Sequence, residues 1–457
     1  MSKSIATSLR AQSGFCAGMT AVAIAAWMAL APQTSFAQDL KSNLAEMLKT
    51  HPRLNATRSD VQSAESKVKD TYLRAWTPNV DMSGETGNQK YGSLANPSGQ
   101  NLTYQRASIK ATQQLWDFGK STRQVAETEA VLNQSRSLAV ASEASLLLEA
   151  LSAHWSYVRA DKILEFSRQS EQSVRRQADI ESSMVELGKG YESNVLQAKV
   201  QLTTAESRRL RAEGAFEIAR ARVRAVFSDL AGKLDYSTIA VVRPAAMPKS
   251  LDEARQMALA NNQQIQVGKF RSQAIQERIG ATNAKEFWPR FNVVAETSLR
   301  AKTDGVDDPR SFGDQKVYLQ FQYTLNAGGA GVSSVDTVSR DYAASVAREV
   351  ETRQLVEEQV TIAWRNVQVA AENRQTLANL VRISAKYYEM AVAERQMGRR
   401  SLLEVLSAEL SLINALSDLM STEADAGIAA ITLMQAVGRL DLGSFDLQPV
   451  QSVLPKI

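Results

Sequence analysis

The chain has 457 residues, a formal net charge of +4 and a single cysteine, Cys16. So small a net charge, without any block of Lys and Arg, argues against a nucleic-acid-binding surface. The two histidines, His51 and His154, have no His or Cys at metal-ligand spacing, so the sequence predicts neither a metal site nor a cofactor.

The first 37 residues have the composition of a secretory signal peptide. Lys3 and Arg10 precede a mostly apolar run, and Ser35-Phe36-Ala37 offers the small residues that signal peptidase reads. Cleavage before Gln38 would remove two positive and no negative charges, leaving an exported chain of net charge +2 without any cysteine. The alternative is an N-terminal membrane anchor, for which the apolar run is short and interrupted.

A stretch of about 190 residues occurs twice, at an offset of about 211 positions. Matched positions keep their apolar or proline character: Leu40, Leu48, Leu54 and Pro78 return as Leu251, Leu259, Ile265 and Pro289. The period is too long for a solenoid and predicts a pseudo-symmetric protomer. We expect a signal peptide over 1–37, repeat 1 over 38–230, a linker over 231–249, repeat 2 over 250–440 and a C-terminal tail over 441–457.

Each repeat is expected to begin with a helix and continue into two strands joined by a loop. The predicted strands are 78–90, 103–117, 289–301 and 315–325, and the loops 92–101 and 303–314 are rich in turn-forming residues and should face solvent. In the clearest strand, one face is apolar and the other polar, as in a transmembrane β-strand. The residues expected to face lipid are Val317, Leu319, Phe321 and Tyr323.

Four strands are too few to close a barrel, and open edges in a membrane would leave backbone groups without hydrogen bonds. Single-chain barrels start at about eight strands, so four per chain imply sharing, and three chains would supply about twelve. An ordinary soluble sheet packed on a helical bundle is the alternative.

The strands are followed by very long helices. Residues 121–187 and 332–397 contain neither Gly nor Pro, which allows helices of roughly 100 Å. Turns at Gly188-Lys189-Gly190 and Gly398-Arg399-Arg400 lead into second helices ending near Asp229 and Val437. Coiled-coil spacing beside the turns predicts two antiparallel hairpins, although a soluble bundle explains that spacing equally well.

Together these features resemble the TolC family of outer-membrane efflux proteins, over about residues 39–440. The resemblance rests on the export signal, the duplication and three motifs: Leu115-Trp116-Asp117-Phe118-Gly119, Leu325-Asn326-Ala327-Gly328-Gly329 and the run from Met397 to Leu406. It implies a mainly α fold with transmembrane β: a homotrimer with a twelve-stranded barrel in outer-membrane lipid and a helical tunnel through the periplasm. The implied partners are a periplasmic adaptor (membrane fusion protein) and an inner-membrane ABC or RND transporter.

The resemblance also implies which residues act at the far ends of the helices. Arg400 and Glu404 would line a periplasmic aperture, where Ser407 replaces a second acidic residue. In repeat 1 the corresponding residues are Gly190, Asn194 and Gln197, so charge would come from repeat 2 alone. Taken by themselves, Arg400 and Glu404 read as an i,i+4 pair on a solvated helix. The hairpin tips expected to dock an adaptor are Gly188, Lys189, Gly190, Gly398 and Arg399.

The residues bear on three classes of function. The first is an export channel, with type I secretion preferred over drug efflux because no cysteine remains for a lipid anchor. The second is a soluble periplasmic helical adaptor or scaffold. An enzyme is the third, and it has no support, since Gly328-Gly329-Ala330-Gly331 lacks the Lys-Ser/Thr of a phosphate loop.

Overall fold

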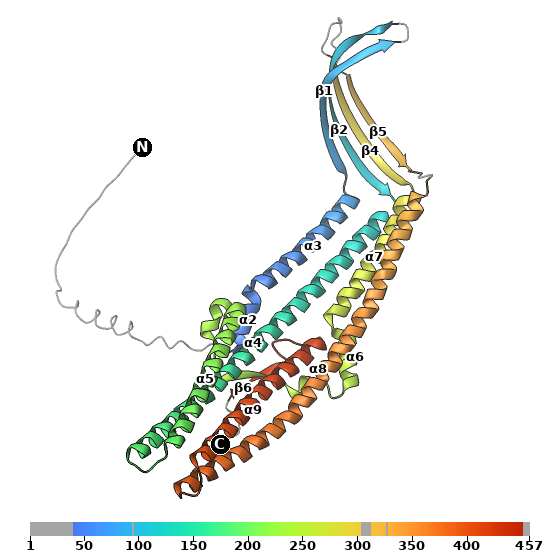
Figure 1. Ribbon diagram of the computed structural model, residues 1–457. Coiled ribbons are helices and arrows are strands. Elements are labelled where there is room, and N and C mark those ends of the chain that lie inside the picture. The colour runs from blue at the N-terminus through green and yellow to red at the C-terminus, as the bar shows by residue number, and fades with distance from the viewer. Residues whose placement is uncertain (1–39, 94–95, 303–311, 326–327, 451–457) are drawn as a thin grey trace, which may run out of the picture.

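The computed structural model describes residues 40–93, 96–302, 312–325 and 328–450. The predicted signal peptide, most of the predicted loop 303–314, the turn residues 326–327 and the last seven residues lie outside these ranges. The molecule is elongated: a curved sheet stands at one end, and helices run from it to two hairpin tips at the other (Figure 1).

Two sets of elements follow one another in the same order, which confirms the fold predicted from the duplication. The first set is α2 Leu40–Thr50, α3 Pro52–Trp76, β1 Asn79–Ser93, β2 Asn96–Trp116, α4 Lys120–Glu186 and α5 Glu192–Phe227. The second is α6 Leu251–Asn261, α7 Gln263–Phe287, β4 Arg290–Lys302, β5 Phe312–Gln322, α8 Ala330–Gln396 and α9 Leu402–Ala436.

The long helices α4 and α8 have 67 residues each, so each is about 100 Å long. Both begin directly after a left-handed glycine, Gly119 with φ +85° and Gly329 with φ +75°. Such a glycine turns the chain out of the sheet at little steric cost. Within the described ranges, no helix has both the length and the apolar character needed to cross a bilayer.

A polar cap divides the first helix of each repeat into two. His51 caps α3 by accepting a hydrogen bond from the backbone N–H of Arg53 at Nδ1, 3.2 Å away. Asn262 caps α7 in the same way, accepting from the N–H of Gln264 at 2.9 Å. The two positions correspond in the repeat, so the role of His51 is that of an N-cap residue.

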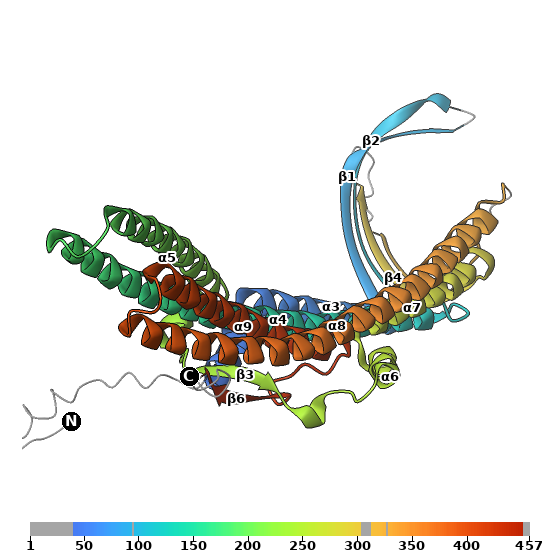
Figure 2. The ribbon, with the colours of Figure 1, turned by 60° about the horizontal axis from the view of Figure 1, so that its bottom comes forward.

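The four long strands form one antiparallel sheet in the order β1-β2-β4-β5. Pairing of β2 with β4, for example Ile109 with Thr297, joins the two repeats. The prediction of a loop over 92–101 is wrong, because β1 and β2 stay paired as far as Ser93 and Asn96. Strand pairing uses backbone groups, which Gly- and Asn-rich segments also have. The sheet is strongly curved (Figures 1 and 2).

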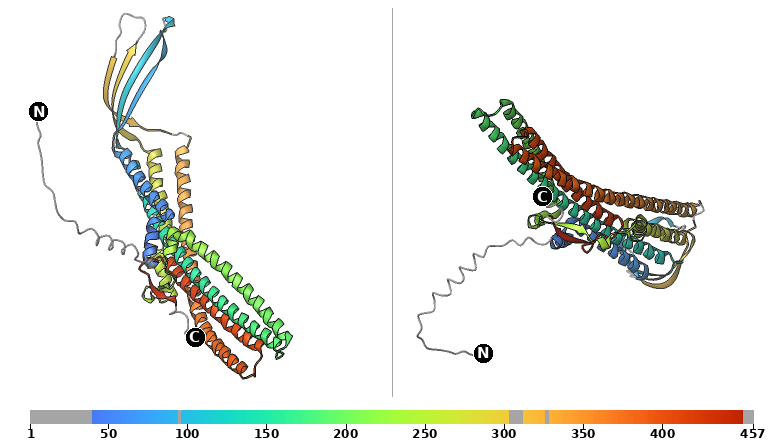
Figure 3. Two further views of the ribbon diagram at one scale, coloured as in Figure 1. Left: turned by 90° about the vertical axis from the view of Figure 1, so that its left-hand side faces the viewer. Right: turned by 90° about the horizontal axis from the view of Figure 1, so that it is seen from below.

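The main core lies midway along the molecule, where a two-stranded sheet packs on the helices. β3 (Thr238–Val242) pairs with β6 (Phe445–Pro449), flanked by the short helices η2 (Ser228–Lys233) and η3 (Pro244–Ala246). The sequence interpretation missed this pairing, because it treated 231–249 as a linker and 441–457 as a tail. Trp155 of α4 is fully buried here and donates its indole N–H to the Ala240 carbonyl at 3.1 Å. Figure 3 shows this small sheet beside the helices.

Candidate functional site

Both hairpin tips turn through the same motif. The N–H groups of Gly188 and Lys189 donate to carbonyls in the last turn of α4, both at 2.9 Å, and those of Gly398 and Arg399 do the same for α8 at 2.8 and 2.9 Å. Gly188 has φ +72° and Gly398 φ +71°. A Cβ at either glycine would meet no atom within 4 Å, so glycine is needed for its backbone conformation and not for space.

Directly after the tips, the two hairpins differ in how the returning helix begins. In repeat 2, Ser401 and Glu404 form a capping box: the Glu404 carboxylate accepts from the Ser401 N–H and hydroxyl, both at 3.0 Å. These hydrogen bonds lower the pKa of Glu404. In repeat 1 the corresponding residues are Tyr191, which makes no side-chain cap, and Asn194. Glu404 therefore holds a helix terminus as well as carrying an exposed charge.

Taken alone, Arg400 and Glu404 were interpreted as an i,i+4 pair on a helix, and this placement is wrong. Arg400 precedes the N-cap of α9 and so lies outside the helix. Its guanidinium instead pairs with Glu394 at 2.9 Å and lies over the ring of Tyr387, 5.3 Å from the centroid. Ser407, one turn after Glu404 on the same helix, is exposed. Arg400 thus fastens the turn back onto α8, and Glu404 fastens the start of α9.

An ion pair that sequence reasoning missed joins the two hairpins. Glu181 of α4 is buried and binds Arg395 of α8. Apolar side chains of both hairpins pack nearby: Val174, Ala178, Ala198, Ala205, Leu402 and Leu406. The two tips consequently lie side by side (Figure 1). A signal for the pair is lacking in the sequence, because its members are 214 positions apart.

Between the tips is a cavity of about 270 Å³. It brings together tip residues and the repeat 1 counterparts of the aperture residues, and both members of the ion pair line it. Its walls include Glu181, Lys189, Gly190, Asn194, Gln197, Arg395 and Ser401. The two repeats therefore meet where the resemblance had put the aperture residues, although Arg400 and Glu404 are not part of this cavity wall.

The predicted alternation of apolar and polar residues on β5 continues onto parts of the other three strands. Val317, Leu319 and Phe321 are 79%, 64% and 60% exposed on one face of β5. Tyr323 follows the end of the strand at Gln322. The pairing register places further apolar residues on the same face: Val80, Met82, Ile109, Val293 and Leu299. On the opposite face, Asn292, Val294 and Ser298 are buried, as expected on the concave side of a curved sheet.

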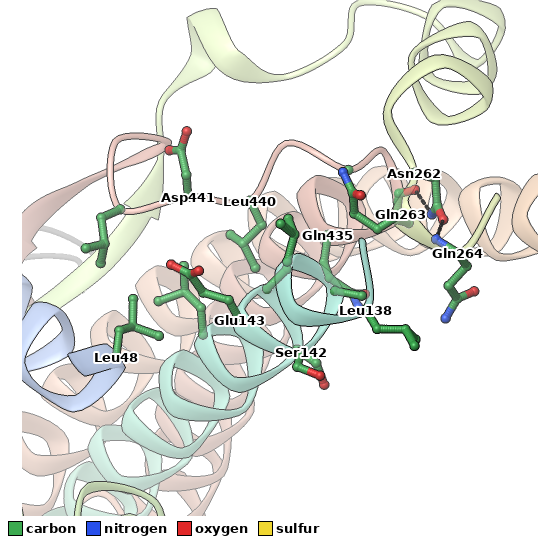
Figure 4. Close-up of a pocket in the computed structure, with 18 of the residues that line it drawn as sticks. Leu48, Leu138, Ser142, Glu143, Asn262, Gln263, Gln264, Gln435, Leu440 and Asp441 are labelled. Atoms are coloured by element: carbon green, nitrogen blue, oxygen red, sulfur yellow. Dashed lines mark hydrogen bonds between the residues drawn. The ribbon is translucent and has the colours of Figure 1, made fainter. Parts of the chain in front are cut away.

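A larger cavity, of about 650 Å³, lies midway along the molecule between the repeats (Figure 4). Amide side chains contribute much of its wall, among them Asn262, Gln264 and Gln435. Asn262 is held in place, since it donates to the Ala436 carbonyl at 2.8 Å and accepts from the Gln264 N–H. The described residues contain no cluster of His, Cys, Asp or Glu that could bind a metal ion.

A duplicated chain with a curved four-stranded sheet and two long helical hairpins has the architecture of a channel protomer. The model of the family described as outer membrane efflux protein matches residues 43–227 and again 254–439, one match in each repeat. The chain belongs to this family, which confirms the resemblance to TolC proteins. It is an outer-membrane efflux channel protein that extends into the periplasm, and it is not an enzyme.

Individual relatives agree with this assignment along nearly the whole chain. Outer membrane efflux protein BepC of Brucella suis biovar 1 (strain 1330) is 23% identical over 428 residues, covering 92% of this chain and 90% of BepC. Outer membrane protein TolC of Escherichia coli (strain K12) is 20% identical over 432 residues, covering 92% and 86%. The CmeC outer membrane channel of Campylobacter jejuni has the same fold, with a TM-score of 0.76 at 13% identity, covering 87% of this chain and 86% of that one.

Proposed function

We propose that three copies of the chain form one channel, with a shared twelve-stranded barrel in the outer membrane and a helical tunnel below it. The observation that carries this proposal is the pair of open edges. Among the described strands, β1 and β5 each have a neighbour on one side only. Open edges in lipid would leave backbone groups unpaired, whereas pairing β5 of one copy with β1 of the next removes every edge.

The faces of the sheet support the same arrangement. Its concave face is polar and would surround the lumen, while its convex face is apolar and would meet lipid. Leu319 and Phe321 are mostly exposed on this convex face, and leaving such side chains in water is unfavourable by about 25 cal/mol per Å² of apolar surface.

Exposed apolar stripes on the helices support trimer contacts in the periplasm. On α8 an exposed apolar residue recurs every seven positions, except at Thr376, which is polar. The exposed residues are Leu355, Ile362, Val369, Ile383 and Met390, and Met397 directly after the helix continues the series. On α5 the exposed apolar residues are Leu196, Val200, Leu210 and Ile218. The heptad spacing on α8 suits a coiled coil with another helix, and the apolar residues of α5 lie on one face, so α5 of one copy and α8 of its neighbour would cover each other.

The hairpin tips are the proposed docking sites for a periplasmic adaptor. The turns from α4 to α5 and from α8 to α9 lie at the end of the molecule farthest from the sheet (Figure 1). They contain Gly188, Lys189, Gly190, Gly398 and Arg399. An adaptor bound there would connect the tunnel to an ABC or RND transporter in the inner membrane. Arg400, Glu404 and Ser407, just after the second tip, would line the narrowest part of the tunnel.

The proposed cargo class is protein, exported by type I secretion. The reason is chemical: Cys16, the only cysteine, precedes the predicted cleavage site, so the mature chain would carry no lipid anchor. Deleting the gene should remove a secreted protein from the culture medium. Greater sensitivity to drugs with an unchanged set of secreted proteins would overturn this choice in favour of drug efflux.

The trimer is tested by cell fractionation and gel electrophoresis without heating. We expect the protein in the outer-membrane fraction as an oligomer of three chains that dissociates on boiling. A monomer in the soluble periplasmic fraction would overturn the proposal and support the adaptor or scaffold alternative.

A further inference from the structure

The two hairpins of the long sheet, β1-β2 and β4-β5, have the same internal register. β4 begins 211 positions after β1 (290 − 79), and α8 begins 210 positions after α4 (330 − 120). Asp81 of β1 therefore corresponds to Asn292 of β4, and their partners across the hairpins, Lys110 and Gln320, are 210 positions apart (320 − 110). The long sheet is thus one hairpin built twice, and the two hairpins meet where β2 pairs with β4.

The pairing of β2 with β4, which we call the inner seam, displaces the second hairpin along the strands. Directly opposite residues lead from Asp81 on β1 to Lys110 on β2 and on to Glu296 on β4. The repeat 1 equivalent of Glu296 is Glu85 (296 − 211), so this row advances four positions (85 − 81) from one hairpin to the next. A closed barrel needs a fixed stagger of this kind, because its strands are tilted against its axis.

The outer edges of the sheet belong to the counterparts of the two strands in the inner seam. β5 corresponds to β2 and β1 corresponds to β4, and among the described strands each has a neighbour on one side only. In the inner seam, Ile109 lies opposite Thr297. Their equivalents are Leu319 (109 + 210) and Thr86 (297 − 211), which lie on the two outer edges. The pairing of the inner seam can therefore be repeated between two copies of the chain.

We propose that β5 of one copy pairs with β1 of the next in the register of the inner seam, so that Leu319 lies opposite Thr86 of the next copy. Each outer edge is then an interface for a second copy of this chain in one defined register. The inference rests on the proposed function, since it requires a shared barrel, and it adds the register, which a shared barrel alone leaves open. Every hairpin in the barrel would be staggered equally against the one before it.

The glycines of β1 support this register, because it gives each of them an aromatic residue as its partner. On the convex face, Phe321 would lie opposite Gly84, where a Cβ would meet no atom within 4 Å and the edge is open to a ring. On the concave face, Tyr318 would lie opposite Gly87. The ring of Tyr104 already covers Gly87 from the β2 side, 3.4 Å from the position of a Cβ. An aromatic residue opposite an edge glycine compensates for the missing side chain.

The residues next to these pairs also match in polarity. On the convex face, the exposed Met82 would lie opposite the exposed Tyr323, which directly follows β5. On the concave face, the hydroxyl of Ser83 would lie opposite the amide of Gln322. Apolar side chains thus meet apolar ones on one face, and polar side chains meet polar ones on the other, as cross-strand pairing requires.

The competing register is shifted by four positions and places Lys316 opposite Glu85 of the next copy. That ion pair adds little, because exposed pairs contribute little to stability and both residues already have partners. Glu85 pairs with Arg106 at 3.5 Å, and Lys316 pairs with Asp314 at 3.4 Å. The competing register would also place Asp314 opposite Gly87 and would give the seam between copies no stagger, unlike the inner seam.

Disulfide cross-linking in the full-length protein measures the register directly. A disulfide needs Cα atoms about 4.4–6.8 Å apart, whereas positions two residues out of register are about 7–8 Å apart. Cys16 is the only cysteine and precedes the predicted cleavage site, so introduced cysteines would have no competitor in the mature chain. Ser83→Cys would be combined in turn with Gln322→Cys, Gln320→Cys or Tyr318→Cys. After mild oxidation and boiling without reductant, we expect at least about tenfold more covalent oligomer from Ser83→Cys/Gln322→Cys than from either other pair.

Two further pairs of substitutions make the result interpretable. Ser83→Cys/Ser108→Cys is the control for oxidation, because these hydroxyls are 2.7 Å apart across β1 and β2 of one chain. Its disulfide should form without joining copies. Thr86→Cys/Leu319→Cys tests the same register on the convex face if the first pair does not assemble. Residues 83 and 322 of one chain lie on opposite edges of the sheet, roughly 14 Å apart across three strand spacings, so their disulfide can form only between copies.

The outcomes separate the register from the proposed function. More covalent oligomer with Gln320→Cys or Tyr318→Cys than with Gln322→Cys would overturn the register and leave the shared barrel intact. Absence of covalent oligomer from every pair between copies, while the control disulfide forms and the wild type is a heat-sensitive trimer, would also overturn it. Failure of the wild type to form a heat-sensitive trimer would instead count against the channel itself.

Discussion

Glu181 of α4 and Arg395 of α8, which are 214 positions apart in the chain, form an ion pair that holds the two hairpins together near their tips. The Glu181 carboxylate is buried, whereas the Arg395 side chain is about one-third exposed. The two residues therefore differ in their access to water: Arg395 can be solvated if Glu181 is removed, whereas Glu181 stays buried if Arg395 is removed.

We expect the two halves of this ion pair to respond differently to mutation. Arg395→Ala would leave a buried carboxylate without a partner, for which the cost in fully buried pairs is about 3–5 kcal/mol and here is less because of solvent screening. Glu181→Ala leaves an arginine that can turn to water, so its cost should be smaller. Hydrogen exchange at the ends of α4 and α8 measures both; equal effects would contradict the asymmetry.

A second prediction concerns the left-handed glycines at the tips. Gly188→Val or Gly398→Val forces a β-branched residue to φ near +70°, which costs roughly 1–2 kcal/mol, and it should abolish export while trimers remain intact. Gly214→Ala in α5 is the matched control, since it adds a Cβ in open space without a positive φ and should stabilise the helix. Normal export by both valine variants would show that the tips do not dock the adaptor.

These two sites show where sequence reasoning succeeds and where it stops. The long helices and their glycine turns could be predicted because the determinants are local: residues 121–187 and 332–397 contain no Gly or Pro, and one Gly follows each run directly. The Glu181–Arg395 pair and the pairing of β3 with β6 could not, because each depends on a partner distant in the chain. Even the run Ile239-Ala240-Val241-Val242, a good strand signal, does not name Phe445–Pro449 as its neighbour.

Charge on the convex face of the sheet should prevent membrane assembly. In the double variant Leu319→Arg/Phe321→Arg, each arginine near the bilayer midplane would cost about 2–4 kcal/mol. The control Gln320→Arg should assemble, because Gln320 lies on the concave face, beside Asn292. The measurement is the heat-sensitive oligomer in the outer-membrane fraction, and similar behaviour of the two proteins would show that the faces are assigned wrongly.

Mild acid should destabilise the central core through His154. Burial lowers the pKa of His154 to about 4, although the Asp235 carbonyl lies 3.4 Å from Nε2. The unfolded chain, with an ordinary histidine pKa of about 6.5, therefore binds more protons between these values. The stability that the neutral His154 contributes is fully present above about pH 6.5 and falls as the pH drops towards 4. His154→Phe, which keeps a ring against Tyr236, should flatten this part of the profile of melting temperature against pH. An unchanged slope in the variant would assign the acid sensitivity to other groups.

The last prediction concerns the proposed aperture, where Glu404 has a structural and an electrostatic role that must be separated. Three Glu404 carboxylates near a three-fold axis would repel each other and attract cations. We therefore expect a cation-selective channel that multivalent cations block from the periplasmic side. Glu404→Gln keeps the capping-box hydrogen bond and removes the charge, whereas Glu404→Ala removes both.

Bilayer recordings should show weaker block in both Glu404 variants, with a loss of helix stability only in Glu404→Ala. Arg400→Ala removes the contacts with Glu394 and Tyr387 that fasten the turn, so it should raise conductance without weakening the block as strongly. Placing a second carboxylate with Ser407→Asp should strengthen the block, because Ser407 is exposed one turn further along α9. If Glu404→Gln and wild type are blocked with the same affinity, Glu404 is only a helix cap and the aperture lies elsewhere.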